Sequence, residues 1–206
     1  ITYDVKPETA KRIGWIRFEA PPGLKGMTIL AKEARVWVKG IEVQVNNGEV
    51  ELNKSPFKVS QVAMQNNMER GKYAGAVFEK PIKLRLEGGI IQPGLWKNYA
   101  LPTYSGIGVY KQQIELNQEE IQKEIILDLG EVFVAAEVFV NNKSAGVKVA
   151  KPFKYNISNL VELGYNEVEV KVANTLAPHY SLPRRARDVG PQGSGLIGPV
   201  NLKISR

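Results

Sequence analysis

The residues best suited to chemistry gather in one stretch, residues 174–193, where arginines stand close to aromatic and titratable side chains. The members that could contact a ligand are His179, Tyr180, Arg184, Arg185, Arg187 and Asp188. A tyrosine ring can stack on the apolar face of a sugar, and arginine can bind hydroxyl or carboxylate groups through two parallel hydrogen bonds. This composition favours a segment that binds either carbohydrate, with three arginines suiting an acidic glycan, or a neighbouring protein domain.

A glycine motif follows at once and indicates a different chemistry. Residues 193–198 read G-x-G-x-x-G, the pattern of dinucleotide-binding loops. That pattern needs a strand before it and a helix after it, because the pyrophosphate lies at the helix N-terminus. Here Pro199 and a predicted terminal strand over 200–204 follow instead. We therefore interpret these glycines as tight-turn residues that lead into the last strand.

Nucleophilic and metal-assisted catalysis lack the residues they require. His179 is the only histidine, and no G-x-S-x-G motif is present for a serine nucleophile. The chain has no cysteine, and zinc sites use several histidine, cysteine or carboxylate ligands. We predict no cofactor and no catalytic metal. The sequence leaves a structural calcium ion open and does not predict one.

Glycoside hydrolysis needs two carboxylates placed on either side of a sugar. The chain has 21 acidic residues, so composition alone does not exclude such a pair. However, Glu119 and Glu120 lie in a polar stretch, and Glu167 and Glu169 alternate with apolar residues as on a solvated strand face. We assign no catalytic residue, and we expect the chain alone not to be an enzyme.

The charge and hydropathy of the chain limit its partners. The formal net charge is +7, but lysines are spread along the predicted strands rather than gathered in a stripe that could follow a nucleic acid backbone. No run of about 20 apolar residues is present that could span a bilayer as a helix. We predict neither nucleic acid nor membrane as a partner.

Short apolar segments separated by turn signals are typical of an all-β chain. Residues 166–173 alternate polar and apolar side chains, as in an antiparallel strand with one wet face. We expect further strands at 124–129 and 137–141, whereas the polar residues 117–124 between strands indicate a loop. Turn sequences such as 21–23, 46–48 and 141–143 divide the segments.

An internal repeat suggests the domain organisation. The segments at 13–18, 36–38, 62–64 and 81–84 recur in the same order at 107–110, 138–140, 170–172 and 199–202. Copies of about 100 residues indicate two similar domains rather than a solenoid. We predict one β-sandwich over residues 1–90, a linker over 91–103 in which Trp96 and Tyr99 pack the domains together, and a second β-sandwich over 104–206. The first residues, Ile1-Thr2, carry no initiator methionine or signal peptide, so we expect a processed product or a piece of a larger protein.

The second copy resembles a known domain family. The residues that carry the resemblance are 104–110, 127–132, 136–141, 164–170, 174–176 and 194–200. They resemble the galactose-binding-like jelly roll of large glycoside hydrolases, including the sugar-binding domains of family 2 enzymes such as β-galactosidases and β-glucuronidases. The C-terminal β-sandwich region of family 106 α-L-rhamnosidases is the closer resemblance, because a W-I-R-F-x-A-P-P-G segment precedes a T-Y-S-G segment there, as Trp15–Gly23 precedes Thr103–Gly106 here.

The resemblance implies two tandem jelly-roll sandwiches and a non-catalytic accessory role. In these enzymes the catalytic carboxylates belong to a separate barrel domain, and such a barrel needs roughly 250 residues of alternating strands and helices. The implied partners are carbohydrate and the catalytic domain of the parent chain, and the implied location is the periplasm or the cell exterior. Two alternatives stay open: a free-standing carbohydrate-binding or adhesion protein, and a complete glycoside hydrolase.

Overall fold

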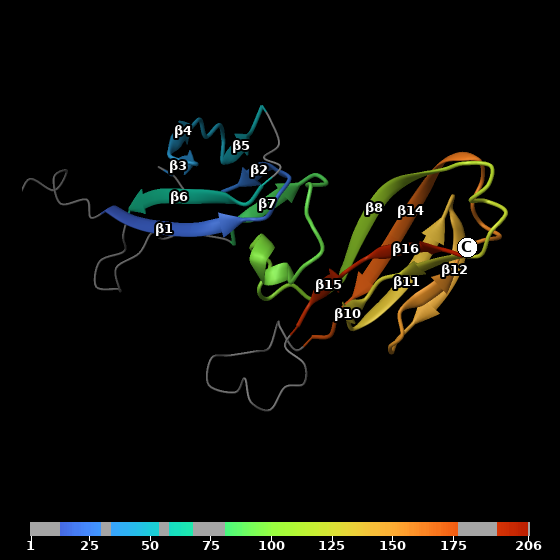
Figure 1. The fold of residues 1–206 in the computed structure, drawn as a ribbon. Coiled ribbons are helices and arrows are strands. Elements are labelled where there is room, and N and C mark those ends of the chain that lie inside the picture. The colour runs from blue at the N-terminus through green and yellow to red at the C-terminus, as the bar shows by residue number, and fades with distance from the viewer. Residues whose placement is uncertain (1–12, 30–33, 54–57, 68–80, 177–192, 206) are drawn as a thin grey trace, which may run out of the picture. The chain divides into compact units, whose positions relative to one another are not determined.

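The computed structural model describes residues 13–29, 34–53, 58–67, 81–176 and 193–205. The chain divides into two compact units, Ile1–Ile91 and Gln92–Arg206 (Figure 1). Each unit pairs its strands in antiparallel sheets around a hydrophobic core of its own. The predicted all-β fold with tandem β-sandwich domains is confirmed.

The first unit contains a sheet of four strands and a sheet of three. The larger sheet has the order β1 (Ile13–Ala20), β6 (Ser60–Asn67), β3 (Arg35–Val38), β4 (Ile41–Val43). The smaller has the order β5 (Glu49–Glu51), β2 (Leu24–Thr28), β7 (Lys83–Leu86). Both sheets contribute to one core, whose buried members are Ala20, Leu24, Met27, Ile29, Val36, Val38, Val50, Val62 and Met64.

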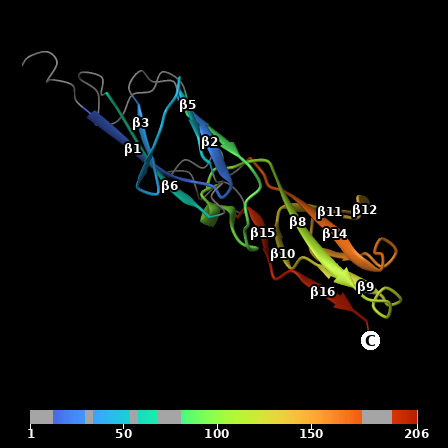
Figure 2. The ribbon, with the colours of Figure 1, turned by 90° about the horizontal axis from the view of Figure 1, so that it is seen from above.

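The second unit repeats this arrangement, with longer strands in its larger sheet. Its larger sheet has the order β8 (Ile107–Leu116), β14 (Gly164–Ala173), β11 (Ala135–Val140), β12 (Lys143–Lys148), and Figure 2 shows β8 and β14 side by side. A sheet of three has the order β13 (Lys154–Asn156), β9 (Ile125–Asp128), β16 (Asn201–Ile204). A third, two-stranded sheet joins β10 (Glu131–Phe133) to β15 (Gly195–Gly198).

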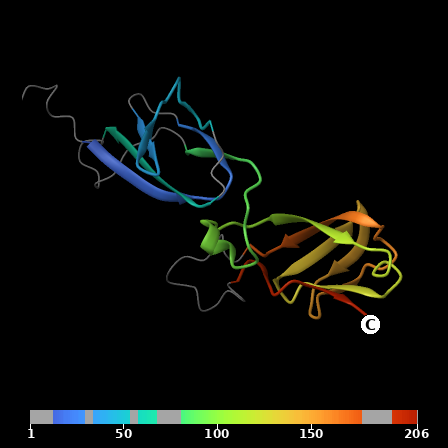
Figure 3. The same ribbon diagram turned by 45° about the horizontal axis from the view of Figure 1, so that its top comes forward.

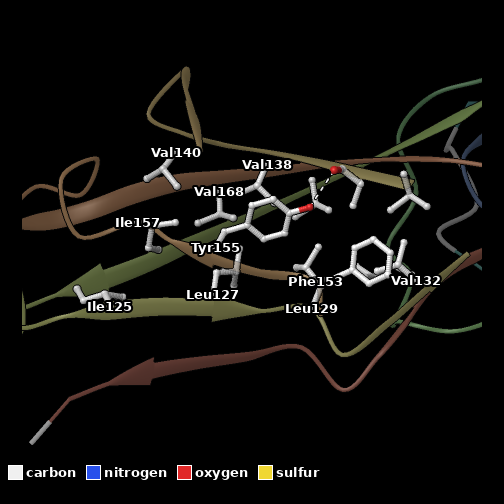
Figure 4. Packing of buried hydrophobic residues seen from close by; sticks show 14 of the residues in the cluster. Ile125, Leu127, Leu129, Val132, Val138, Val140, Phe153, Tyr155, Ile157 and Val168 are labelled. Atoms are coloured by element: carbon white, nitrogen blue, oxygen red, sulfur yellow. Dashed lines mark hydrogen bonds between the residues drawn. The ribbon is translucent and has the colours of Figure 1, made fainter. Parts of the chain in front are cut away.

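Tyr155 lies inside the second core (Figure 4). Its ring is buried among apolar residues, and its hydroxyl donates a hydrogen bond of 2.8 Å to the carbonyl oxygen of Ala136. Burial raises the pKa of Tyr155 to about 12, because an ionised phenol would lose its hydration there. The other buried members are Trp96, Leu116, Ile125, Leu127, Leu129, Val132, Ala136, Val138, Val140, Phe153, Ile157, Val168, Val170, Val172 and Leu196.

The sheet order and the hairpins show that the two units are structural repeats. β1, β6, β3 and β4 correspond in order to β8, β14, β11 and β12, and β5, β2 and β7 correspond to β13, β9 and β16. Two-residue turns with positive φ at both positions close the β3–β4 hairpin at Lys39-Gly40 and the β11–β12 hairpin at Asn141-Asn142. Such turns match the twist of the strands that they join.

The register corrects one part of the sequence repeat. The sequence pairs residues 62–64 with 170–172, but Trp37 lies opposite Ala63 while its counterpart Phe139 lies opposite Glu169. The structural counterpart of Ala63 is therefore Glu169, and the alignment shifts by two residues. A shift of two positions keeps every side chain on the same face of a strand, so hydrophobic alternation alone does not detect it.

Residues 92–103, expected to form a linker, belong to the second unit. They include the 3-10 turn η2 (Trp96–Tyr99), drawn in green at one end of the second sandwich in Figure 3. Trp96 is buried in the second core, and its indole Nε1 donates a 2.6 Å hydrogen bond to the Tyr110 hydroxyl. A tryptophan with an apolar cavity and a hydrogen-bond acceptor fixes its own segment to the domain that provides them.

The strands predicted at 124–129, 137–141 and 166–173 are confirmed as β9, β11 and β14. The polar residues 117–123 form turns, as expected for a loop. Of the helices in the described part of the chain, none is long and apolar enough to span a membrane.

Candidate functional site

The six residues that the sequence singled out lie outside the described residues. They are His179, Tyr180, Arg184, Arg185, Arg187 and Asp188, and all fall within residues 177–192. The structure describes the residues on both sides of this segment, at the end of β14 and the start of β15.

The Asn174 side chain joins the two ends of the segment. Its Nδ2 donates hydrogen bonds to the Ser194 hydroxyl, at 2.8 Å, and to the Tyr104 carbonyl oxygen, at 2.7 Å. Its Oδ1 accepts a hydrogen bond of 2.9 Å from the Gly106 backbone N–H. The residues that flank the segment on its two sides are therefore joined directly to each other.

Tyr110 and Trp96 support this place from within the unit. The Tyr110 hydroxyl accepts hydrogen bonds from Trp96 Nε1 and, at 3.3 Å, from the Leu196 backbone N–H. Gly195 has a φ of +125°, and a Cβ there would lie 2.5 Å from the Gly94 carbonyl oxygen. The glycine motif thus serves close backbone packing in a turn and strand, as the sequence analysis expected.

A second candidate site is a groove on the outward face of the larger sheet of the first unit. We call it the β1–β3 groove, and its volume is about 520 Å³. Its lining residues are Trp15, Arg17, Phe18, Glu19, Trp37, Gly40, Gln61, Val62 and Ala63. Ala63, on the central strand β6, lies opposite Arg17 on one side and Trp37 on the other, so a small residue forms the floor.

Two tryptophans form the apolar part of the groove. The Trp15 and Trp37 ring centroids lie 5.0 Å apart, with the ring planes inclined by 38°. Trp15 is 40% exposed, and the Arg17 guanidinium lies 4.9 Å from the centroid of its ring. Two neighbouring tryptophan rings that are partly exposed offer a flat apolar surface to a partner.

An ion pair holds the outer side of Trp37 in place. Arg35 lies 4.9 Å from the centroid of the Trp37 ring and donates two hydrogen bonds of 2.7 Å to the Glu42 carboxylate. The hydrogen bond from Arg35 lowers the pKa of Glu42, and the same contact raises the pKa of Arg35. Glu42 thereby fixes Arg35, and Arg35 covers one side of the Trp37 ring.

Three further polar side chains border the groove. Within the part of the chain that the structure describes, the side chains of Arg17, Glu19 and Gln61 form no hydrogen bond or ion pair with the protein. Together they offer donors and acceptors beside the tryptophans. The groove can therefore bind a ligand that has both an apolar face and hydroxyl groups.

Three carboxyl groups of the described residues have shifted pKa values, and none of these three is suited to act as a general acid. The carboxyl groups with a resolved pKa shift, Glu42, Asp128 and Glu169, are all shifted down, each mainly by a hydrogen bond from a cation. A general acid needs a raised pKa. Among the described residues, no group of three or more histidine, cysteine or acidic side chains is placed to hold a metal ion.

Sequence reasoning missed the β1–β3 groove. Trp15 and Trp37 belong to strands that meet only through β6, so their proximity depends on the sheet order. The available signal was alternation: Trp15, Arg17 and Glu19 point to one face of β1, and Arg35 and Trp37 point to the same face from β3. Outward-facing tryptophans at strand spacing could have indicated a binding surface.

Comparison with known proteins gives one sequence relative and several distant structures. No family model matches the chain. A "Putative beta-glucuronidase" of Formosa agariphila is 34% identical over 80 residues, which are 38% of this chain and 7% of that protein. The chain thus spans only a small part of the length of the curated relative that it matches.

Two similar solved structures are a rhamnosidase and a β-glucuronidase. A rhamnosidase from Novosphingobium sp. PP1Y is 17% identical with a TM-score of 0.46, covering 95% of this chain and 25% of that chain. A β-glucuronidase of Bacteroides uniformis is 24% identical with a TM-score of 0.43, covering 57% of this chain and 14% of that chain. The resemblance to part of a larger glycoside hydrolase is confirmed.

Proposed function

We propose that the chain is a non-catalytic accessory region of a larger glycoside hydrolase, which binds carbohydrate, supports the catalytic domain, or does both. The observation that carries the proposal is the match to the Formosa agariphila protein, because it covers only 7% of that protein. The parent enzyme would be α-L-rhamnosidase-like or β-galactosidase-like and would act in the periplasm or outside the cell.

The fold supports a non-catalytic role. A (β/α)₈ barrel of the kind that carries catalytic carboxylates takes roughly 250 residues. This chain has 206 residues, and its described part forms antiparallel sheets. The carboxyl groups with resolved shifts are better stabilised in their ionised form than in the protonated form that a general acid requires.

The activity part of the proposal is tested with the chain alone. We expect no turnover on a panel of nitrophenyl glycosides that includes rhamnoside, galactoside, glucuronide and mannoside. Turnover that disappears on mutation of a single aspartate or glutamate would contradict the proposal and favour a complete hydrolase. The length of the parent gene then separates an accessory region from a free-standing adhesion protein.

The segment that contains Arg184 and Arg185 is proposed as one contact surface of this region. The residues that flank it, Asn174 and Ser194, are hydrogen-bonded to each other, and loops held by a sandwich commonly carry binding. Three arginines suit an acidic glycan or an acidic patch on the catalytic domain. His179, Tyr180, Arg187 and Asp188 would complete this surface.

Calorimetry distinguishes these two contacts. If the segment binds glycan, acidic oligosaccharides should bind saturably, more weakly at high salt, and not at all to the double variant Arg184→Ala/Arg185→Ala. The variant Lys97→Ala/Lys123→Ala removes the same charge elsewhere on the second unit and should retain binding. Absence of binding at millimolar oligosaccharide would overturn the glycan version and leave docking on the catalytic domain.

A further inference from the structure

We propose that the β1–β3 groove binds a neutral glycan chain, with Trp15 as the apolar contact and Arg17, Glu19 and Gln61 as hydrogen-bonding groups. The inference rests on the proposed carbohydrate context of the chain. It concerns a surface of the first unit, remote in sequence from the arginine-rich segment, and so adds a second binding site to the proposed function.

The apolar contact comes from the exposed part of Trp15. The ring is 40% exposed although it lies on a sheet strand beside another tryptophan. A pyranose ring has an apolar face of C–H groups that packs against an indole, and covering the indole removes apolar surface from water. The Trp37 ring lies against Trp15, with 5.0 Å between the ring centroids and 38° between the ring planes, and so helps to hold Trp15 in place.

The hydrogen-bonding groups border this contact. Arg17 and Glu19 extend from the same face of β1 as Trp15, and Gln61 lies opposite Glu19 on β6. The end groups of Glu19 and Gln61 form no hydrogen bond or ion pair within the described residues, so they can bind sugar hydroxyls without breaking such a bond. Arg17 stacks on the Trp15 ring, and its N–H groups form no hydrogen bond with the described residues. Arg35, in contrast, is bound to Glu42 and serves to hold Trp37.

The charges of the groove favour a neutral ligand. Arg17 and Glu19 contribute one charge of each sign, and Arg35 and Glu42 neutralise each other as an ion pair. The attraction of an acidic glycan to Arg17 would be offset by its repulsion from Glu19. Because the contacts are stacking and hydrogen bonds, added salt should change the affinity little.

The size of the groove agrees with a short stretch of glycan. Its volume of about 520 Å³ lies within the range of about 300–1,000 Å³ that is typical of small-molecule sites. Ala63 forms the floor on the central strand and leaves space between Arg17 and Trp37. A longer side chain at position 63 would occupy the place of the ligand.

The test uses the full 206-residue chain, titrated with hexasaccharides of xylose, glucose, mannose and galactose and with a hexamer of galacturonate. We expect at least one neutral hexasaccharide to bind saturably, by calorimetry and by a change in tryptophan fluorescence, with similar affinity at low and high salt. Two of the three tryptophans of the chain lie at the groove, so the fluorescence reports on this site. Trp15→Ala should weaken binding by about tenfold or more, as expected when a large aromatic contact is lost.

Two further variants control for folding and position. Ala63→Glu keeps both tryptophans but fills the floor, and it should weaken binding as strongly as Trp15→Ala. Tyr165→Ala removes an aromatic ring that is 72% exposed on the second unit, and it should leave binding unchanged. Circular dichroism of each variant establishes that the fold is retained.

The outcomes separate this inference from the proposed function. Binding of the galacturonate hexamer that depends on Arg184 and Arg185 but not on Trp15 would support the proposed function independently of the groove, whereas neutral glycan binding that Trp15→Ala leaves unchanged would overturn the groove as a sugar site. Absence of neutral glycan binding at millimolar concentration would also overturn it. So would loss of association with the parent catalytic domain on Trp15→Ala without any glycan binding, because the groove would then be a protein contact.

Discussion

In both units the four-stranded sheet turns one face outward, and the two faces carry different side chains at corresponding positions. In the first unit Trp15, Arg17 and Ala63 occupy β1 and β6. Their counterparts on β8 and β14 are Val109, Lys111 and Glu169. The corresponding residues on the third strand are Trp37 and Phe139, each opposite the residue at the centre of the face.

The face of the second unit is occupied by its own ion pairs. Lys111 lies 2.8 Å from Glu169 and 3.2 Å from Glu167, and Lys171 lies 3.4 Å from Glu169. The Lys171 ammonium also lies 4.2 Å from the centroid of the Phe139 ring. The charged groups here pair with one another, whereas in the groove of the first unit Glu19 and Gln61 form no hydrogen bond or ion pair with the described residues, and the floor is an alanine. Repetition of a fold therefore need not repeat a binding surface.

The largest expected loss of stability follows from truncating a buried side chain in either core, and it shows whether the two cores are separate. Met64→Ala in the first core and Ile157→Ala in the second should each lower the free energy of unfolding of its own unit by about 2–5 kcal/mol, because both side chains are fully buried. Hydrogen exchange measured on peptides from β6 and from β14 reports each unit. Equal loss of protection in both units from either variant would contradict separate cores.

A matched surface change calibrates that measurement. Ile41 is 71% exposed on β4. Ile41→Ala removes the same kind of side chain from the surface and should change the stability by less than about 0.5 kcal/mol.

The next largest loss of stability is expected from a buried polar residue, and Asn166 and Ser60 occupy corresponding strand positions in the two units. The Asn166 side chain accepts hydrogen bonds from the Glu162 backbone N–H and from Asn141 Nδ2, both at 2.7 Å, and donates to the carbonyl oxygens of Glu162 and Gly164. Ser60 makes a single long hydrogen bond of 3.4 Å to the Lys58 carbonyl oxygen.

Asn166→Ala should therefore cost about 3 kcal/mol, because it leaves buried partners without hydrogen bonds. Ser60→Ala should cost less than about 1 kcal/mol. Urea denaturation of the two variants provides the comparison. Similar losses of stability would show that the Asn141–Asn166 network contributes no more than one weak hydrogen bond.

The smallest effect concerns the ion pairs of the second unit. A hydrogen bond from Lys111 is the main cause of the lowered pKa of Glu169. A carboxyl group with a lowered folded-state pKa stabilises the protein above its unfolded pKa, and this contribution is lost as the pH falls through the folded-state value. Lys111→Met should raise the pKa of Glu169 toward its ordinary value of 4.5 and weaken the loss of stability in acid.

NMR titration of the Glu169 carboxyl carbon measures this shift directly. Gln113→Met, on the same face of β8, provides the control and should leave the titration unchanged. A Glu169 pKa that does not respond to Lys111→Met would show that Lys171 alone stabilises the carboxylate.

The sequence predicted the parts of the fold that depend on local alternation. Residues 166–173 alternate along a single strand, and the structure has β14 there. The expected linker over 91–103 differs from the structure because the burial of Trp96 depends on Tyr110 and β15, which follow later in the chain. The register shift at Ala63 also escaped detection, since a two-residue slip leaves the pattern of inward and outward side chains intact.

The candidate sites divide in the same way. The arginine-rich segment was visible because its residues are close in sequence, and it remains a prediction because it lies outside the described residues. The β1–β3 groove became visible only with the sheet order, which places Trp15 and Trp37 on opposite sides of β6. Composition can reveal functional residues that are close in sequence. Functional residues on different strands are recognised only when the pairing of the strands is known.

Asn174 and Ser194 are hydrogen-bonded to each other, so the residues between them can change during evolution while this connection is kept. The closing contacts come from Asn174, Tyr104 and Gly106, all outside the segment, so we expect them to persist when residues within it are substituted. The entropic cost of a longer loop grows only by about 0.6 kcal/mol for each doubling of its length. Descendants of this domain can therefore acquire new lengths and compositions there, and with them new partners, while inheriting the same sandwich.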